Sequence, residues 1–165
     1  MTDVLVWIEE LSFSTWLRES SSLWAFPTFL YLHTLGMAIV GGGAVVVSFA
    51  LLGLWPKGAP LKPLERFYPV LWIGFWIDAL TGVSIFMKDA GTYGRNPDVY
   101  VKLLFVFAGV ALLLVMRKRV FRNPQLDNGP LPKPAKLLAW ASLLCWFAAV
   151  IGGRLIAYLQ PLPVF

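Results

Sequence analysis

Four ionisable residues stand inside otherwise apolar stretches of this sequence, and each belongs to a different stretch. They are His33, Asp78, Lys102 and Arg154, and His33 is the only histidine in the chain. Ionisable groups at membrane depth are costly to desolvate, and they generally face the interior of a helix bundle or water. We therefore expect these four residues to group toward one end of a bundle, as candidates for a functional site.

Two interpretations of this group differ in what His33 does. In the structural interpretation, Asp78 forms an internal ion pair with Arg154 or Lys102, and a neutral His33 is hydrogen-bonded across helices. In the functional one, His33 Nε2 is an axial ligand and therefore a metal ligand of a b-type haem, whose propionates point to Arg154, Lys102 or Arg95. We favour the structural interpretation, which requires no cofactor, and keep haem b as a possible cofactor in the alternative.

Other chemistries have less support in the residue types. A haem would need a sixth ligand from Met37, from Met87 or from a second subunit, or it would keep an open position. A proton or quinone path through His33 and Asp78 is a further hypothesis. Copper transport is disfavoured, because four methionines and the single cysteine, Cys145, form no ladder of soft ligands. No pattern of catalytic residues stands out, so we predict a protein that is not an enzyme.

The composition places these residues in a membrane protein. The chain has 165 residues, of which 58% are hydrophobic and 14% charged, whereas about 25% of residues are charged in soluble domains. Residues 26–55 contain no Asp, Glu, Lys or Arg, and about 20 apolar residues are enough for a helix to cross the hydrocarbon core. The net charge of +5 comes from basic residues collected beside apolar segments, which does not indicate nucleic-acid binding.

The sequence predicts an all-α fold: one integral membrane four-helix bundle with an N-terminal amphipathic interfacial helix. Trp7 and Trp16 would lie at headgroup depth, although a helix that packs on a partner protein would show the same amphipathic pattern. Glycine and proline predict a non-helical first loop, a short polar turn at residues 89–98 and a further loop at residues 121–134. Within the turn, Pro97 and Asp98 suit the start of a helix. The interfacial helix is expected over residues 3–18, and the spans over about 23–55, 64–88, 99–116 and 136–159 of a single domain, 1–165.

The distribution of lysine and arginine predicts the orientation. By the positive-inside rule, both termini and the second loop lie outside, which is the periplasmic side of a bacterial inner membrane. Nine basic residues lie in the first and third loops: Lys57, Lys62, Arg66, Arg117, Lys118, Arg119, Arg122, Lys133 and Lys136.

Small residues at Gly41 to Gly43 and at Gly152 to Gly153 predict close helix contacts. From these features we predict a non-enzymatic membrane subunit that packs as a homo-oligomer or within a larger inner-membrane complex. Its partners are then the lipid bilayer and other membrane subunits.

Several short motifs, taken in order, resemble the bacterial four-span family DUF6644, whose architecture is similar to that of CopD-like copper-resistance proteins. The resemblance implies an inner-membrane four-helix bundle and brings no established activity. The chain departs from the family at Leu30, Ser48 and Ala50, where members often carry charged residues. The motifs are Trp7-Ile8-Glu9, Leu17 to Ser20, Pro27 six residues before His33, His33 to Gly36, Leu51 to Gly53, Asn96 to Leu104 and Gly153 to Tyr158.

Overall fold

Every regular element in the described part of the chain is helical, which confirms the predicted all-α fold class. The computed structural model describes residues 2–56, 59–123, 126–127, 131 and 133–158. The elements are α1 (Thr2–Glu10), α2 (Ser12–Glu19), α3 (Phe26–Leu52), the 3₁₀ segment η1 (Lys62–Phe67), α4 (Tyr68–Lys88), α5 (Ala90–Arg95), α6 (Pro97–Met116), the π-helical turn η2 (Arg117–Phe121) and α7 (Lys133–Tyr158).

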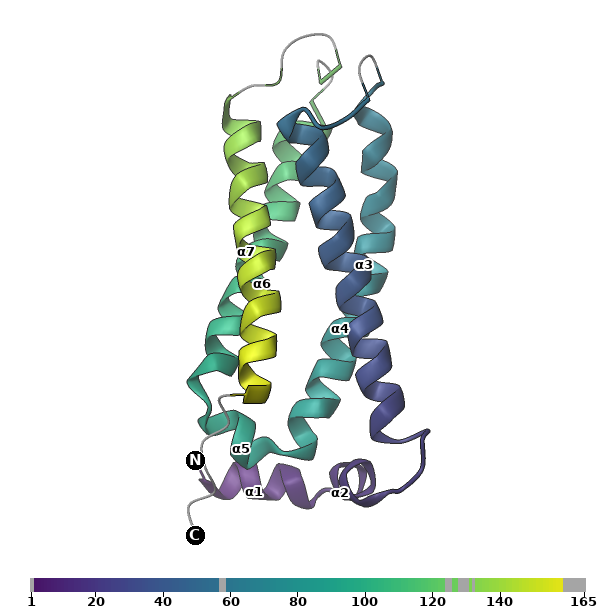
Figure 1. Cartoon of the computed structure of the whole chain (residues 1–165), viewed down its shortest axis with the longest axis vertical. Helices are drawn as coiled ribbons and strands as arrows, with labels where there is room; N and C mark the ends of the chain where they lie inside the picture. The colour runs from purple at the N-terminus through teal and green to yellow at the C-terminus, as the bar shows by residue number, and fades with distance from the viewer. Residues whose placement is uncertain (1, 57–58, 124–125, 128–130, 132, 159–165) are drawn as a thin grey trace.

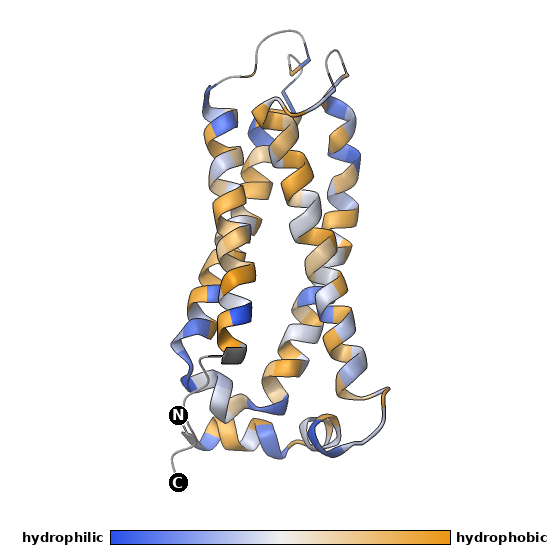
Figure 2. Cartoon of the chain, viewed as in Figure 1, coloured by the Kyte–Doolittle hydropathy of each residue, from blue (hydrophilic) through white to orange (hydrophobic). Residues whose placement is uncertain are grey.

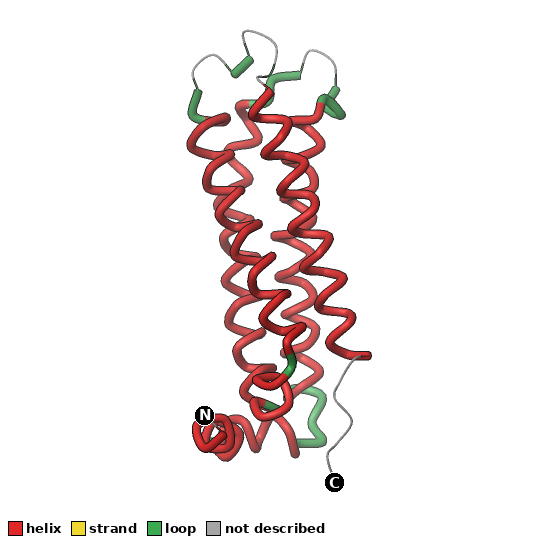
Figure 3. Tube along the Cα trace, turned by 90° about the vertical axis from the view of Figure 1, so that its left-hand side faces the viewer, coloured by secondary structure: helices red, strands yellow, loops and turns green. Residues whose placement is uncertain are grey.

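Four of these helices are long and apolar enough to cross a membrane: α3, α4 with η1, α6 with η2, and α7. They run side by side along the long axis of the molecule (Figures 1 and 3). Helix α3 packs against α4, α6 packs against α7, and α3 joins the two pairs through α7. Apolar residues cover most of the length of all four helices (Figure 2). The chain is therefore a multi-pass membrane protein.

The N-terminal segment, expected as one helix, forms two helices that lie across one end of the bundle (Figure 1). The prediction of a single helix was wrong because the backbone at Leu11 is extended, with φ −57° and ψ 139°. Ser14 Oγ spans the break by donating to the Ile8 carbonyl at 2.7 Å. Leu17 is fully buried and fixes α2 to the bundle. We call α1, α2 and α5 together the platform.

Residues 89–98, predicted to be a short polar turn, contain the helix α5. Two contacts with α1 explain why these residues form a helix. Glu9 Oε1 accepts a hydrogen bond of 2.6 Å from the backbone N–H of Gly91, one of the first donors of α5, which no helical carbonyl satisfies. Leu5 packs so closely on Gly94 that a Cβ there would lie 2.9 Å from Leu5 Cδ1. Tertiary contacts thus outweigh the low helix propensity of the glycines.

The helix ends differ from the predicted ones by a few residues. Helix α6 begins at Pro97, because Asn96 Oδ1 caps it by accepting from the Asp98 N–H at 2.9 Å. Helix α3 ends at Leu52 and is followed by Gly53, whose φ of 93° suits glycine. The third loop is shorter than predicted, since η2 extends to residue 121 and α7 begins at residue 133. Two predicted features lie outside the described residues. They are the end of the last span at residue 159 and the basic residue Lys57 of the first loop.

The three consecutive glycines of α3 face different surroundings. Gly41 is buried, and a Cβ there would lie 3.7 Å from the Trp146 ring of α7. A Cβ on Gly43 would collide with the side chain of Leu71 in α4. Gly42 is exposed and has no neighbour within 4 Å of its Cβ position. Two of the glycines thus allow helix contacts within the bundle, as predicted, while the third points outward.

Candidate functional site

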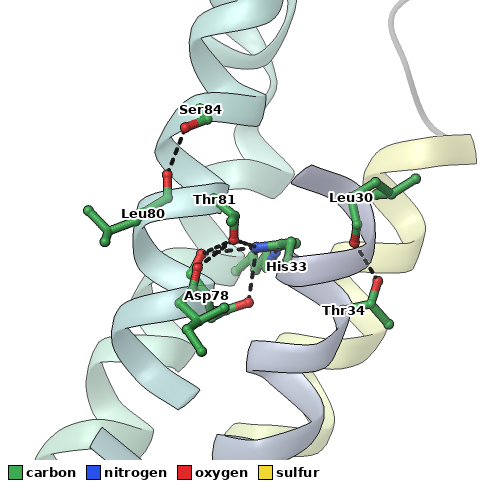
Figure 4. A network of polar contacts seen from close by, with 9 residues as sticks. Leu30, His33, Thr34, Asp78, Leu80, Thr81 and Ser84 are labelled. Atoms are coloured by element: carbon green, nitrogen blue, oxygen red, sulfur yellow. Dashed lines mark hydrogen bonds and ion pairs between the residues drawn. The ribbon is translucent and has the colours of Figure 1, made fainter. Parts of the chain in front are cut away.

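The side chain of His33 reaches from α3 to α4, about midway along α4 (Figure 4). Its Nδ1 atom lies 3.0 Å from the backbone oxygen of Asp78 and 3.0 Å from Asp78 Oδ1. Thr81 Oγ1, one turn further along α4, is 3.3 Å from the same nitrogen. Three oxygen atoms of α4 therefore surround one edge of the imidazole ring.

Glycines permit this close approach of α3 and α4. A Cβ on Gly36 would lie 2.6 Å from the backbone nitrogen of Asp78 and 2.8 Å from the carbonyl oxygen of Gly74. A Cβ on Gly82 would lie 3.1 Å from His33 Cε1. Side chains at these positions would hold the backbones apart. The contact between His33 and Asp78 thus depends on glycine in both helices.

Lys102 approaches the opposite edge of the ring from α6. Its Nζ atom lies 3.4 Å from His33 Nε2. On its other side, the lysine stem runs past Gly152 and Gly153 of α7, where Cβ atoms would lie 3.6 Å from Lys102 Cβ and 3.5 Å from Nζ. The small residues of α7 thus leave space for a lysine, and all four spans meet around one row of side chains.

The partners of the two ring nitrogens define the hydrogen positions. Thr81 Oγ1 donates its only hydrogen to the Ile77 carbonyl at 2.5 Å, so it can only accept a hydrogen bond from the ring. Nδ1 faces only acceptors and must carry the ring proton. Nε2 faces the Lys102 ammonium, which has no lone pair, and must accept. The three side chains are therefore an Asp78 carboxylate, a neutral His33 imidazole and a Lys102 ammonium. Together they carry no net charge.

The Asp78 carboxylate oxygen Oδ1 interacts with the imidazole through its charge rather than through a hydrogen bond. Asp78 Oδ1 is buried and has no partner in hydrogen-bond geometry, although Nδ1 is 3.0 Å away. The Nδ1 proton is therefore directed at the Asp78 carbonyl, and the carboxylate attracts it from the side. We call Asp78, His33 and Lys102 the polar row.

The row contains three of the four residues that the sequence singled out. Arg154 is exposed on α7, and no hydrogen bond or ion pair joins it to the row in the described part of the chain. Of the two partners predicted for Asp78, Lys102 belongs to the row, and it reaches Asp78 through the imidazole. Arg95, considered for haem propionates, is exposed in α5.

The geometry fits interhelical bonding better than haem ligation. An iron atom at Nε2 would have to displace the Lys102 ammonium, which lies 3.4 Å from that nitrogen. There is also little space between the imidazole and Gly82 of α4, since a Cβ on Gly82 would already lie 3.1 Å from His33 Cε1. The described residues include no group of three or more His, Cys, Asp or Glu residues that could hold a metal ion.

Sequence reasoning missed Thr81 and the glycines around the ring. A signal was available, because Gly74, Asp78 and Gly82 follow one another at intervals of four and share one face of a helix. Thr81 is adjacent to that face.

No family model, curated protein or solved structure matches the chain.

Proposed function

We propose that this chain is a non-enzymatic integral membrane subunit in which the polar row fastens the four spans together. The observation that supports this proposal is that the imidazole of His33 engages α4 through Nδ1 and α6 through Nε2. Interhelical polar contacts of this kind stabilise membrane bundles. The resemblance to DUF6644 and the basic loops favour a bacterial inner membrane, with both termini on the periplasmic side.

An exposed strip of small residues on α3 supports assembly with other subunits. Thr34, Ala38 and Gly42 are all exposed and follow one another at intervals of four, so they lie along one side of the helix. Small residues at this spacing let two membrane helices approach closely. The occupant that we propose is the same strip of a second copy, which would make a homo-oligomer.

Gly42→Leu tests the assembly. The variant should fold, because nothing lies within 4 Å of the Cβ position, but it should lose the oligomer, because a leucine keeps two α3 helices apart. Ala111→Leu is the matched control, since Ala111 is exposed on α6 and outside the strip. Mass measurement of each purified variant in nanodiscs gives its oligomeric state. An oligomer of wild-type size in Gly42→Leu would contradict the proposed interface.

A haem b electron carrier is the second candidate. The observation in its favour is that the Nδ1 contact with Asp78 orients the ring and leaves the lone pair on Nε2, as ligating histidines require. His33 would be the axial ligand, and the haem would supply one-electron chemistry.

The visible spectrum separates the two candidates. We expect purified protein from haem-supplemented cells to show no Soret band, because Lys102 lies at Nε2. A Soret band that disappears in His33→Gln would reverse the ranking.

A further inference from the structure

The three residues of the polar row lie at increasing depth from the platform end of the bundle. Lys102 follows the first residue of α6, Pro97, by five positions, and His33 follows the first residue of α3, Phe26, by seven. Asp78 lies in the middle of α4, ten residues before Lys88. At 1.5 Å per residue these depths are about 8, 10 and 15 Å. The row therefore leads from near one end of the bundle to its middle.

We propose that Lys102, His33 and Asp78 form a proton relay from the platform end of the bundle to its middle. The relay has two states with the same number of protons. In the first, Lys102 is an ammonium, His33 carries its proton on Nδ1, and Asp78 is a carboxylate. In the second, Lys102 is a neutral amine, His33 carries its proton on Nε2, and Asp78 is a carboxylic acid.

The transfer between the states balances bond by bond. One N–H bond at Lys102 Nζ breaks as an N–H bond forms at His33 Nε2. The N–H bond at Nδ1, which points at the Asp78 carbonyl in the first state, turns toward the carboxylate and breaks as an O–H bond forms at Asp78 Oδ1. The distances for these two steps are 3.4 Å and 3.0 Å. No other reactant takes part, and no group in the second state is charged. Asp78 Oδ1, which lacks a hydrogen-bond partner in the first state, becomes a protonated oxygen in the second.

The surroundings direct the proton along this row. Thr81 of α4 donates to Ile77 and offers the ring only a lone pair. Helix α7 presents Gly152 and Gly153 to the row, and these add no charge. Beyond the row, an apolar cavity of about 10 Å³ lies between α3, α4 and α6, lined by Val40, Leu71, Phe75 and Val110 among others. The relay thus ends at Asp78. It adds proton movement to the fastening role and does not depend on assembly.

Because His33 is the only histidine, ¹⁵N-histidine labelling gives one Nδ1 and one Nε2 signal. In wild-type protein in nanodiscs, we expect the two signals to be shifted toward each other, since each nitrogen carries the proton part of the time. Protonation of the ring from solvent would also bring the two signals together, but it would move the signal of the unprotonated nitrogen much further than that of the protonated one. It would therefore change the mean of the two shifts, whereas exchange between the neutral tautomers leaves that mean unchanged. The spectra should be recorded at several pH values, because transfer within the row keeps the number of protons constant.

Two variants that keep the polar contacts but stop the transfer complete the test. In Lys102→Arg the positive charge remains, but guanidinium does not release its proton. In Asp78→Asn an acceptor oxygen remains, but the amide does not take up a proton. Both variants should separate the two signals to the positions of a fixed Nδ1–H tautomer. Arg154→Gln, which changes an exposed basic residue outside the row, should give the wild-type spectrum.

Two results would overturn the relay. Fully separated signals in the wild-type protein would mean that the row is static and only fastens the helices. Signals that remain shifted toward each other in both variants would mean that the tautomers exchange by another route. Either result would leave the proposed structural subunit intact, because that role requires only the hydrogen bonds.

Discussion

Gly36→Ala should destabilise the protein far more than a single methyl group usually does. The new Cβ would lie 2.6 Å from the backbone nitrogen of Asp78 and 2.8 Å from the carbonyl oxygen of Gly74. Neither atom belongs to a flexible side chain, so α3 and α4 must separate. Overpacking usually costs about 1–3 kcal/mol, and we expect a loss of free energy of unfolding at the upper end of this range. Moving the helices apart would also lengthen the contact of His33 with Asp78.

Gly42→Ala is the matched control for this effect. Gly42 is in the same helix, but nothing lies within 4 Å of its Cβ position. Alanine is favoured over glycine inside a helix by about 0.5–1 kcal/mol, and it is still a small residue of the kind that the proposed interface contains at Ala38. This variant should therefore be as stable as wild type or more so. Chemical unfolding in detergent micelles, followed by tryptophan fluorescence, compares the two. Equal stability of both variants would show that α3 and α4 do not meet at Gly36.

The sequence was sufficient to predict the helical class and the depth of each polar residue, because both depend on the order of residue types. It was not sufficient to predict the direction in which each side chain points. Arg154 and Lys102 are both basic and both lie near the platform end. Gly152 and Gly153 face Lys102, and the next residue is rotated by about 100° around the helix axis. Arg154 therefore points away from the row and is exposed.

The platform shows a second limit of sequence reasoning. Residues 90–95 contain two glycines, and the pattern of residues 3–18 continues across Leu11 without interruption. Helix α5 forms because Glu9 caps it and Leu5 packs on it. These contacts join residues more than 80 positions apart in the chain. A local pattern contains no information about them.

The second large effect is expected from removing one charge of the polar row. In Lys102→Met, the Asp78 carboxylate loses its positive partner, and its side chain is only 13% exposed. Breaking a buried ion pair that is in direct contact usually costs about 3–5 kcal/mol, and we expect a smaller loss here because the imidazole of His33 stands between the two charges. Uptake of a proton by Asp78 would limit the loss, so we expect the larger loss at high pH and a smaller one at low pH.

The double variant Lys102→Met/Asp78→Leu should recover most of this stability, because no buried charge is left without a partner. Replacing both members of a buried pair by apolar residues is often neutral or stabilising. Arg154→Met is the control, and it should be close to wild type because Arg154 is exposed. The free energies of unfolding of the wild type, Lys102→Met, Asp78→Leu and the double variant form a double-mutant cycle. If the losses of the two single variants simply added in the double variant, Lys102 and Asp78 would not be coupled. The imidazole of His33 would then not connect the two charges.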